Sequence, residues 1–267
     1  MNREPGVDLN SHEKPLADRH ALITGASRGI GRAIAEALCA QGANVTILGR
    51  DGESLSETAA TLGAEVNTAV ADVTDAEAVR AAFARAAEQS GPITILINNA
   101  GMAQSAPLHR TDEQLWQRVL AVNLSGTYHC IHSALPGMLS AGWGRIVNIA
   151  SSAGQVGYPY VAAYCAAKHG VIGLTRALAL ETATKGITVN AVCPGYTATE
   201  IVREAVANIR QKTGRTDEQA LAELVRHNPQ GRLVRPEEVA NAVSWLCMPG
   251  SDSVTGQSIA VSGGEVT

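Results

Sequence analysis

The chain has 267 residues, of which 45% are hydrophobic and 17% are charged. This balance is typical of one large globular α/β domain with a sizeable core and excludes a disordered chain. A net charge of −4 argues against a surface that binds nucleic acid.

Residues 1–18 are polar and carry both signs of charge, so we expect a loose N-terminal extension ahead of a catalytic domain over residues 19–267. The five cysteines have no CxxC spacing, which favours reduced thiols and a cytoplasmic location. No run of about 18 apolar residues is present, so we expect no membrane span.

A glycine-rich turn, GASRGIG, follows a strand expected over His20–Thr24 and precedes a helix expected over Arg32–Gln41. Strand, glycine turn and helix in this order favour a βα unit whose backbone N–H groups bind a pyrophosphate. A glycine turn without a ligand is the alternative at this point. The residues that would contact a dinucleotide here are Gly25, Ser27, Arg28, Gly29, Ile30 and Gly31.

The second strand, expected over Asn44–Gly49, ends where dinucleotide-binding folds meet the adenosine ribose. Position 50 is Arg, and Arg28 adds a second cation. The charges of Arg28 and Arg50 favour a 2′-phosphate on the adenosine ribose, so we expect NADP(H) as the cofactor. NAD(H) stays possible as the cofactor if Arg50 is merely solvated and Asp51 binds the ribose instead.

The third strand, expected over Glu65–Ala71, is followed by Asp72 and Val73. We expect both residues to contact the cofactor, with the Asp72 carboxylate accepting a hydrogen bond from the adenine amino group. The alternative role for Asp72 is to cap the helix expected over Asp75–Gln89, although Thr74 or Asp75 can serve equally well.

A fourth strand, Ile93–Ile97, has the continuous apolar run of a central parallel strand. The small residues that follow it leave room for a ligand above the sheet edge: Asn99, Ala100 and Gly101.

Residues 112–140 favour a long helix that is interrupted at Asn123 and Gly126. A buried Asn amide is costly without partners, so Asn123 either bonds the backbone at a kink or orders a water. His129 and His132 lie three residues apart in this helix. Without further ligands they do not indicate a metal site, and we expect none.

The fifth strand, Gly144–Ile149, leads to Ser151, and a helix carrying Tyr164 and Lys168 follows it to about residue 184. A spacing of four residues places the phenol and the ammonium on one face of the helix. The nearby positive charge should lower the pKa of Tyr164 and make it a proton carrier. A Tyr at the core edge beside a solvated Lys is the alternative when this pair is considered alone.

The sixth strand, Ile187–Cys193, is followed by a polar segment, about 196–230, that we expect to act as a lid. Within that segment, weak helical periodicity is present around residues 217–226. A helix over Pro236–Leu246 and a last strand over Gln257–Val261 complete the pattern. Alternating strands and helices predict one doubly wound sheet of about seven parallel strands with helices on both faces.

From about His20 onward the chain resembles the short-chain dehydrogenase/reductase family, which implies a Rossmann-like fold. The residues that carry the resemblance are Thr24, Gly25, Gly29, Gly31, Asp72, Asn98, Asn99, Ala100, Gly101, Asn123, Ser151, Tyr164, Lys168, Pro194 and Gly195. Each motif is weak or moderate by itself, but their order and their places at strand ends are specific.

The resemblance implies a catalytic tetrad of Asn123, Ser151, Tyr164 and Lys168. Tyr164 would give its proton to a ketone oxygen while the nicotinamide delivers hydride to the carbonyl carbon. Ser151 would hydrogen-bond the same oxygen as charge develops on it. Lys168 would lower the pKa of Tyr164 and hold the nicotinamide ribose, and Asn123 would hold the water through which the proton is replaced.

The resemblance also implies that the segment after the sixth strand contacts the nicotinamide, through Pro194, Gly195, Thr197 and Thr199. It implies a homotetramer as well, with interfaces formed by helices near residues 112–140 and 158–184 and by the last strand.

Within the family, residues 144–151 and 186–194 resemble reductases of 3-oxoacyl thioesters and polyketides, whereas residues 180–184 resemble 3-hydroxybutyrate dehydrogenases. No polar set to clamp a small carboxylate is evident, so we expect a mostly apolar, partly aromatic pocket. Its expected members are Ser151, Ala153, Tyr158, Tyr164 and Tyr196.

The sequence and the resemblance therefore predict an NADP(H)-dependent ketoreductase that acts on 3-oxoacyl thioesters or polyketide-type ketones. One alternative is an NAD(H)-dependent 3-hydroxybutyrate-type dehydrogenase. An epimerase or dehydratase that retains the hydride, and a cofactor-binding protein without turnover, are the others.

Overall fold

The structure is a computed structural model, and it describes residues 14–63 and 66–267. Within these residues, parallel strands form a seven-stranded sheet in the order β3-β2-β1-β4-β5-β6-β7. The strands are β1 (His20–Thr24), β2 (Asn44–Gly49), β3 (Asn67–Val70), β4 (Ile93–Asn98), β5 (Gly144–Ile149), β6 (Ile187–Pro194) and β7 (Ser258–Val261). The order reverses between β1 and β4, which confirms the doubly wound arrangement.

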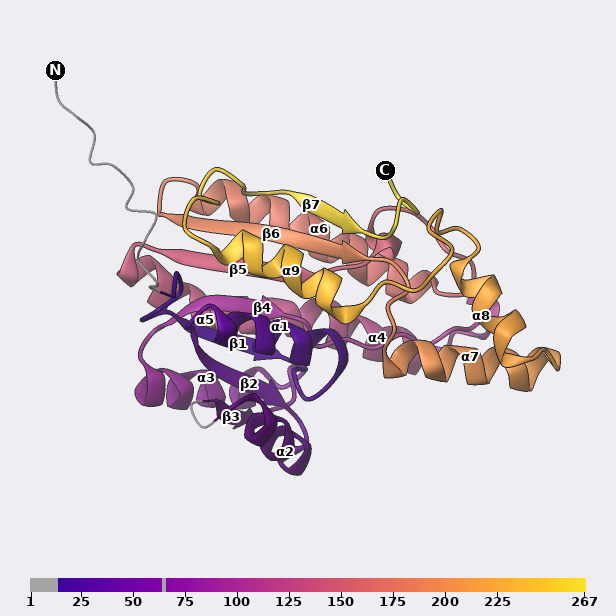
Figure 1. Cartoon of the computed structure of the whole chain (residues 1–267), viewed down its shortest axis with the longest axis horizontal. Coiled ribbons are helices and arrows are strands. Elements are labelled where there is room, and N and C mark those ends of the chain that lie inside the picture. The colour runs from indigo at the N-terminus through magenta and orange to yellow at the C-terminus, as the bar shows by residue number, and fades with distance from the viewer. Residues whose placement is uncertain (1–13, 64–65) are drawn as a thin grey trace, which may run out of the picture.

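Helices cover both faces of the sheet (Figure 1). On one face lie α1 (Gly29–Ala40), α2 (Gly52–Leu62) and α9 (Pro236–Cys247), and on the other lie α3 (Ala76–Ser90), α5 (Gly126–Ala141) and α6 (Ala162–Thr182). Side chains alternate between the faces along each strand. In β1, Ile23 packs into the core under α1 and α9, whereas its neighbour Leu22 packs under α3 and α5.

Part of the expected loose N-terminal extension, residues 1–18, is packed against the domain. Residues 1–13 lie outside the described residues. Leu16, however, is fully buried in the core under α1, and its N–H donates to the Gln41 carbonyl oxygen at 3.0 Å. The packed domain therefore begins before residue 19, because burial of this leucine removes apolar surface from water.

The long helix expected over residues 112–140 is built from three pieces: α4 (Glu113–Leu120), a π-helical turn over Ala121–Ser125, and α5. The buried amide of Asn123 lies in the π turn. Its Nδ2 donates to the carbonyl oxygens of Met102 and Val119, both at 2.9 Å, and its Oδ1 accepts from the Met102 N–H at 3.2 Å. Of the two arrangements that the sequence allowed, the structure shows the bonds to the backbone.

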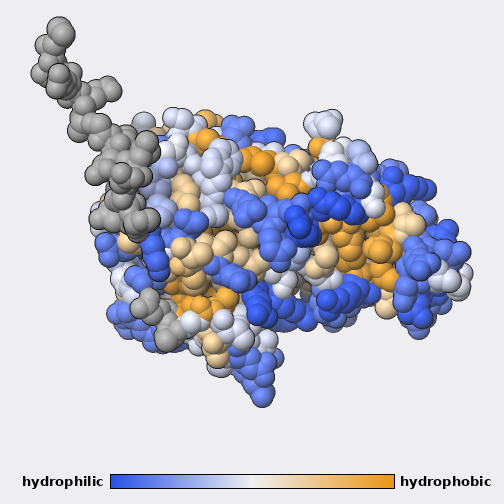
Figure 2. Space-filling model, in the orientation of Figure 1, coloured by the Kyte–Doolittle hydropathy of each residue, from blue (hydrophilic) through white to orange (hydrophobic). Residues whose placement is uncertain are grey.

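The polar segment after β6 forms two helices, α7 (Glu200–Thr213) and α8 (Asp217–Val225). They lie at the end of the sheet toward which β6 and β7 point (Figure 1). On the face shown in Figure 2, apolar residues gather next to these helices, whose own surface is mostly polar. Among the residues that the structure describes, no helix has the length and apolar character to cross a membrane.

Candidate active site

The motifs singled out in the sequence lie together at the carboxyl ends of the strands, which form one end of the sheet. Because the strands are parallel, their carboxyl ends lie together, and the residues after β1, β4, β5 and β6 face a common region. The two halves of this region are a glycine turn after β1 and a group of polar side chains after β5.

The glycine turn is shaped by close approach to the loop after β4. Gly25 and Gly29 have φ angles of 63° and 56°, which side chains rarely adopt. A Cβ on Gly31 would lie 2.5 Å from Asn99 Nδ2 and from the Gly25 carbonyl oxygen. Asn99 Nδ2 in turn donates to the carbonyl oxygens of Thr24 and Gly25, each at 2.9 Å. Only glycine at position 31 allows this packing.

The start of α1 fits an anion. Arg28, the N-cap residue of α1, makes no capping hydrogen bond with its side chain to any described residue. The first N–H groups of the helix are therefore open to a ligand, and the helix dipole favours a negative charge there. Thr199 stands over the turn, because a Cβ on Gly29 would lie 3.1 Å from its Cγ2. Ser27 and Ile30 complete the turn, where Ile30 packs on the core.

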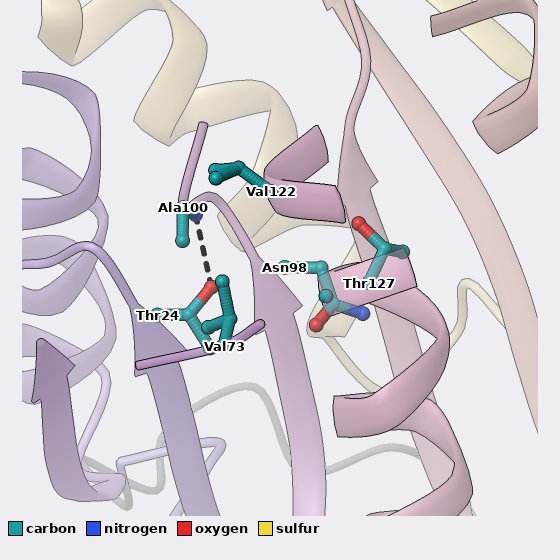
Figure 3. A pocket seen from close by; sticks show the side chains of 7 residues that line it. Thr24, Val73, Asn98, Ala100, Val122 and Thr127 are labelled. Carbon is teal, nitrogen blue, oxygen red and sulfur yellow. Dashed lines mark hydrogen bonds between the residues drawn. The ribbon is translucent and has the colours of Figure 1, made fainter. Parts of the chain in front are cut away.

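The loop after β4 is held in place by residues that line a narrow gap beside the glycine turn (Figure 3). Thr24 Oγ1 accepts hydrogen bonds from the N–H groups of Asn99 and Ala100 at 3.0 and 2.9 Å. Val73 also lines the gap, and a Cβ on Gly126 would come within 2.7 Å of its Cγ2. The gap has no room for a water molecule, so it is packing that supports the loop after β4.

Arg50 directly follows β2. Its side chain is 78% exposed, and its Nη1 lies 3.9 Å from Asp72 Oδ2. Asp51 is engaged elsewhere, because its carboxylate caps α2 by accepting from the N–H groups of Glu53 and Ser54. Asp51 would therefore have to give up a helix cap to meet a ribose, whereas the exposed Arg50 guanidinium is held by the long ion pair with Asp72.

Asp72 does not cap α3, since Asp75 accepts from the first N–H groups of that helix. Asp72 Oδ1 instead accepts from the N–H and the hydroxyl of Thr74, at 2.9 and 2.8 Å. The helix-cap alternative for Asp72 is therefore wrong, and its side chain is held at the strand end by a local turn.

The polar group after β5 brings the four tetrad residues together. Ser151 hydrogen-bonds the Tyr164 phenol, and Ser151 Oγ accepts from the Ala153 N–H at 3.1 Å. Lys168 Nζ donates to the carbonyl oxygen of Ile149, the last residue of β5, at 2.8 Å and lies 5.6 Å from the Tyr164 ring centre.

Gly101 connects this group to the π turn. A Cβ at this position would stand 2.9 Å from Asn123 Oδ1 and 3.7 Å from Lys168 Nζ. Gly101, in the loop after β4, therefore lies between the Asn123 amide and the Lys168 ammonium, and its lack of a side chain leaves space between them.

The pKa of Tyr164 differs from the sequence-based expectation. Burial raises the pKa of its phenol to about 12, although the hydrogen bond from Ser151 lowers it. The Lys168 ammonium, which was expected to lower this pKa, donates to a backbone carbonyl, and burial lowers its own pKa to about 8. The phenol is consequently protonated at neutral pH, as a proton donor to a ketone oxygen must be.

The segment after β6 lies over the glycine turn through Thr199, as described above. Thr197 is buried, and its Oγ1 donates to the Gly195 carbonyl oxygen at 3.0 Å. Gly195, which follows Pro194, is packed against the tail of the chain, because a Cβ there would lie 2.8 Å from Glu265 Oε2.

The expected substrate residues surround the same edge. Ala153 is buried, and the rings of Tyr158 and Tyr196 meet edge to face with their centres 6.4 Å apart. Tyr158 Oη lies 2.6 Å from Glu265 Oε1. Sequence reasoning missed Glu265, and the only signal for it was the Gly263–Gly264 pair that turns the chain just before it.

Within residues 14–63 and 66–267, no group of three His, Cys, Asp or Glu side chains has the arrangement of a metal site. His129 Nδ1 lies 2.9 Å from the Val73 carbonyl oxygen, so this ring supports the loop after β3.

Comparison with known proteins identifies the family. A family model described as short chain dehydrogenase matches residues 19–210. The chain is 37% identical over 250 residues to a D-beta-hydroxybutyrate dehydrogenase of Rhizobium meliloti, covering 91% of this chain and 97% of that one. It is 41% identical over 254 residues to an acetoacetyl-CoA reductase of the same organism, covering 92% and 98% of the two chains.

Among solved structures, a variant of actinorhodin polyketide ketoreductase with NADPH superposes with a TM-score of 0.89 at 38% identity, over 92% of this chain and 97% of that one. The parallel sheet with helices on both faces agrees with these matches. The chain belongs to the short-chain dehydrogenase/reductase family, whose members bind NAD(P)(H), and it is an oxidoreductase that interconverts a ketone and an alcohol.

Proposed function

We propose that the protein is an NADP(H)-dependent reductase of 3-oxoacyl thioesters or polyketide-type ketones. The observation that carries this proposal is the placement of the Tyr164 phenol beside Ser151, with its ring centre 5.6 Å from Lys168 Nζ, at the carboxyl ends of the strands. A neutral phenol in this place can give a proton to a carbonyl oxygen, which is the requirement of ketone reduction.

In the proposed mechanism, the glycine turn would hold a nicotinamide dinucleotide, which when bound would supply hydride for the carbonyl carbon. The substrate oxygen lies between Tyr164 Oη and Ser151 Oγ, where Tyr164 donates its proton and Ser151 donates a hydrogen bond as charge develops. Lys168, held by the Ile149 carbonyl, keeps a positive charge beside the phenol once its proton has left.

Asn123 has a positioning role in this scheme. Both protons of its amide are already donated to the carbonyl oxygens of Met102 and Val119. Its Oδ1 keeps one lone pair for a water, beside the space where Gly101 meets Lys168. The amide therefore fixes the loop after β4 against the π turn and leaves a single acceptor for proton replacement.

The substrate class is supported by the surroundings of Tyr164. The Tyr164 ring packs with an apolar cluster that includes Leu115, Ala163 and Trp116. We propose that Tyr158, Tyr196 and Ala153 line the same pocket and that residues 196–230, with α7 and α8, are the lid over it. The names of an acetoacetyl-CoA reductase and a polyketide ketoreductase among the relatives agree with a 3-oxo substrate. A 3-hydroxybutyrate-type dehydrogenase is the second candidate, because one such relative is 37% identical.

The test is consumption of NADPH or NADH, followed by nicotinamide absorbance, with 3-oxoacyl N-acetylcysteamine thioesters, bulky cyclic ketones and acetoacetate. We expect consumption of NADPH with the thioesters or the cyclic ketones. Turnover restricted to short free hydroxy acids with NAD would overturn the proposal in favour of the second candidate. A new product without net change in the cofactor would indicate an epimerase.

Cofactor preference is predicted to depend on Arg50. In an Arg50→Asp variant, a carboxylate replaces the exposed cation, so it repels a 2′-phosphate and accepts from a free 2′-hydroxyl. We expect the ratio of kcat/KM for NADPH to that for NADH to fall by about ten- to a hundred-fold, the worth of one charge-assisted hydrogen bond.

The matched control is Arg85→Asp, which makes the same change of charge at an exposed position on α3 and should leave the ratio unchanged. If Arg50→Asp also leaves the ratio unchanged, another cation, such as Arg28, binds the phosphate.

A further inference from the structure

One carboxylate near the proposed substrate site has no part in the mechanism above. Glu265 lies after β7, and its Oε1 is 2.6 Å from the phenol oxygen of Tyr158, which is itself 3.0 Å from Ser152 Oγ. A phenol has one proton, so Tyr158 donates it to the carboxylate and accepts from the Ser152 hydroxyl. Glu265 is thereby linked to the residue next to Ser151.

The tail of the chain is folded so that it presents this carboxylate to the site. Gly263 and Gly264 have φ angles of 65° and 89°, a left-handed turn that favours glycine. A Cβ on Gly263 would overlap the Asn228 side chain, so the turn is packed against the end of the lid segment. The Glu265 N–H then donates to the carbonyl oxygen of the buried Ser262 at 3.3 Å.

The second oxygen of the carboxylate is buried without a partner. Glu265 Oε2 makes no hydrogen bond to any residue that the structure describes. It lies against the backbone of Gly195, where only the absence of a side chain leaves room for it. A buried acceptor without a donor is costly, so the charge of this carboxylate is poorly compensated and disfavours a ligand that brings a second negative charge close to it.

The position of Glu265 relative to the reacting group follows from the two tyrosines. Tyr158 and Tyr196 meet edge to face, and Tyr196 interacts electrostatically with both Glu265 and Tyr164. Burial first, and then its hydrogen bond to Glu265, raise the pKa of Tyr158. The carboxylate is therefore joined through Tyr158 to Ser152, the residue after Ser151 in the loop where expected substrate residues lie.

We propose that Glu265 is a specificity-determining residue that excludes ketones with a free carboxylate near the carbonyl and admits their ester or thioester counterparts. The inference rests on the proposed function and narrows its substrate class. It also separates this chain from a 3-hydroxybutyrate-type dehydrogenase, whose substrate is an anion at the position that Glu265 would repel.

The test compares acetoacetate with methyl acetoacetate, because the two 3-oxo compounds differ only in whether the carboxyl group is charged. The wild-type protein should have a higher kcat/KM for the ester. Glu265→Gln keeps an acceptor for Tyr158 but removes the charge. We expect it to raise kcat/KM for acetoacetate by about ten-fold and to change that for the ester by less than about two-fold.

Glu237→Gln on the exposed first turn of α9 is the matched control and should move neither value. If the wild-type protein reduces acetoacetate as well as the ester, the proposal is wrong, whether or not the variant folds. It is also wrong if Glu265→Gln leaves the ratio unchanged, or if it alters only the KM of the cofactor. If neither of these two compounds nor any ketone of the panel is reduced, the proposed function itself is wrong.

Discussion

Tyr164→Phe is expected to lower kcat for ketone reduction by about 10²–10⁴-fold, the usual worth of a positioned general acid. The variant keeps the ring, which packs beside Trp116 and Ala163 on the helices around the site. It removes only the hydroxyl group that is bonded to Ser151. Cofactor binding should stay nearly intact, because the glycine turn and Lys168 are unchanged.

The measurement is steady-state reduction by NADPH, together with a titration of NADPH binding by fluorescence. Tyr128→Phe is the control, since this half-exposed tyrosine on α5 loses the same atom away from the site. Retention of more than a few per cent of wild-type kcat in Tyr164→Phe would show that another group donates the proton. Loss of NADPH binding would show that the variant is damaged beyond its chemistry.

Asp252→Asn is expected to lower the free energy of unfolding by about 3 kcal/mol, because it leaves a buried guanidinium without its counter-charge. The partner, Arg145 in β5, has a fully buried side chain whose Nη2 lies 2.5 Å from Asp252 Oδ1. The guanidinium also lies 4.3 Å from the ring centre of Trp143, and its Nη1 donates to the Gly144 carbonyl oxygen at 3.0 Å.

The comparison that isolates this effect is Arg145→Met, alone and combined with Asp252→Asn. An apolar side chain of similar length removes both the charge and its need for a partner, so the combined variant should be more stable than Asp252→Asn alone. Glu77→Gln, which breaks an exposed ion pair with Arg80, should cost less than about 1 kcal/mol. Urea unfolding measures all four variants. Equal stability of Asp252→Asn and the wild-type protein would show that water or backbone groups satisfy the guanidinium.

The sheet and the position of the site follow from the sequence because their signals are local. Continuous apolar runs mark the central strands, as in Ile93–Ile97, and parallel strands bring the residues after them to one edge. The helix α7 was not predicted, although Val202, Val206 and Ile209 recur at helical spacing in its sequence. Charged and polar residues dominate the segment, and in the structure Val202 is the only residue of this helix that is buried, so its apolar side is only partly covered.

Other features depended on packing between distant segments. Leu16 is buried only because the chain before β1 returns across α1, and no neighbouring residue in the sequence indicates this. The protonated state of Tyr164 follows from burial at the site, whereas a spacing of four residues suggested only the effect of a nearby ammonium. The contact between Glu265 and Tyr158 joins residues 107 positions apart, a distance over which composition and periodicity carry no information.

The packing of α1 has a consequence for the order in which the chain matures during synthesis. The apolar side of this helix, including Ile34 and Leu38, shares its core with Val239 and Val243 of α9. A ribosome makes these partners some two hundred residues later. Strands β1, β2 and β4 can cover part of the apolar side of α1 early, but its packing is complete only when translation is almost finished, and such a long-range contact is expected to form slowly.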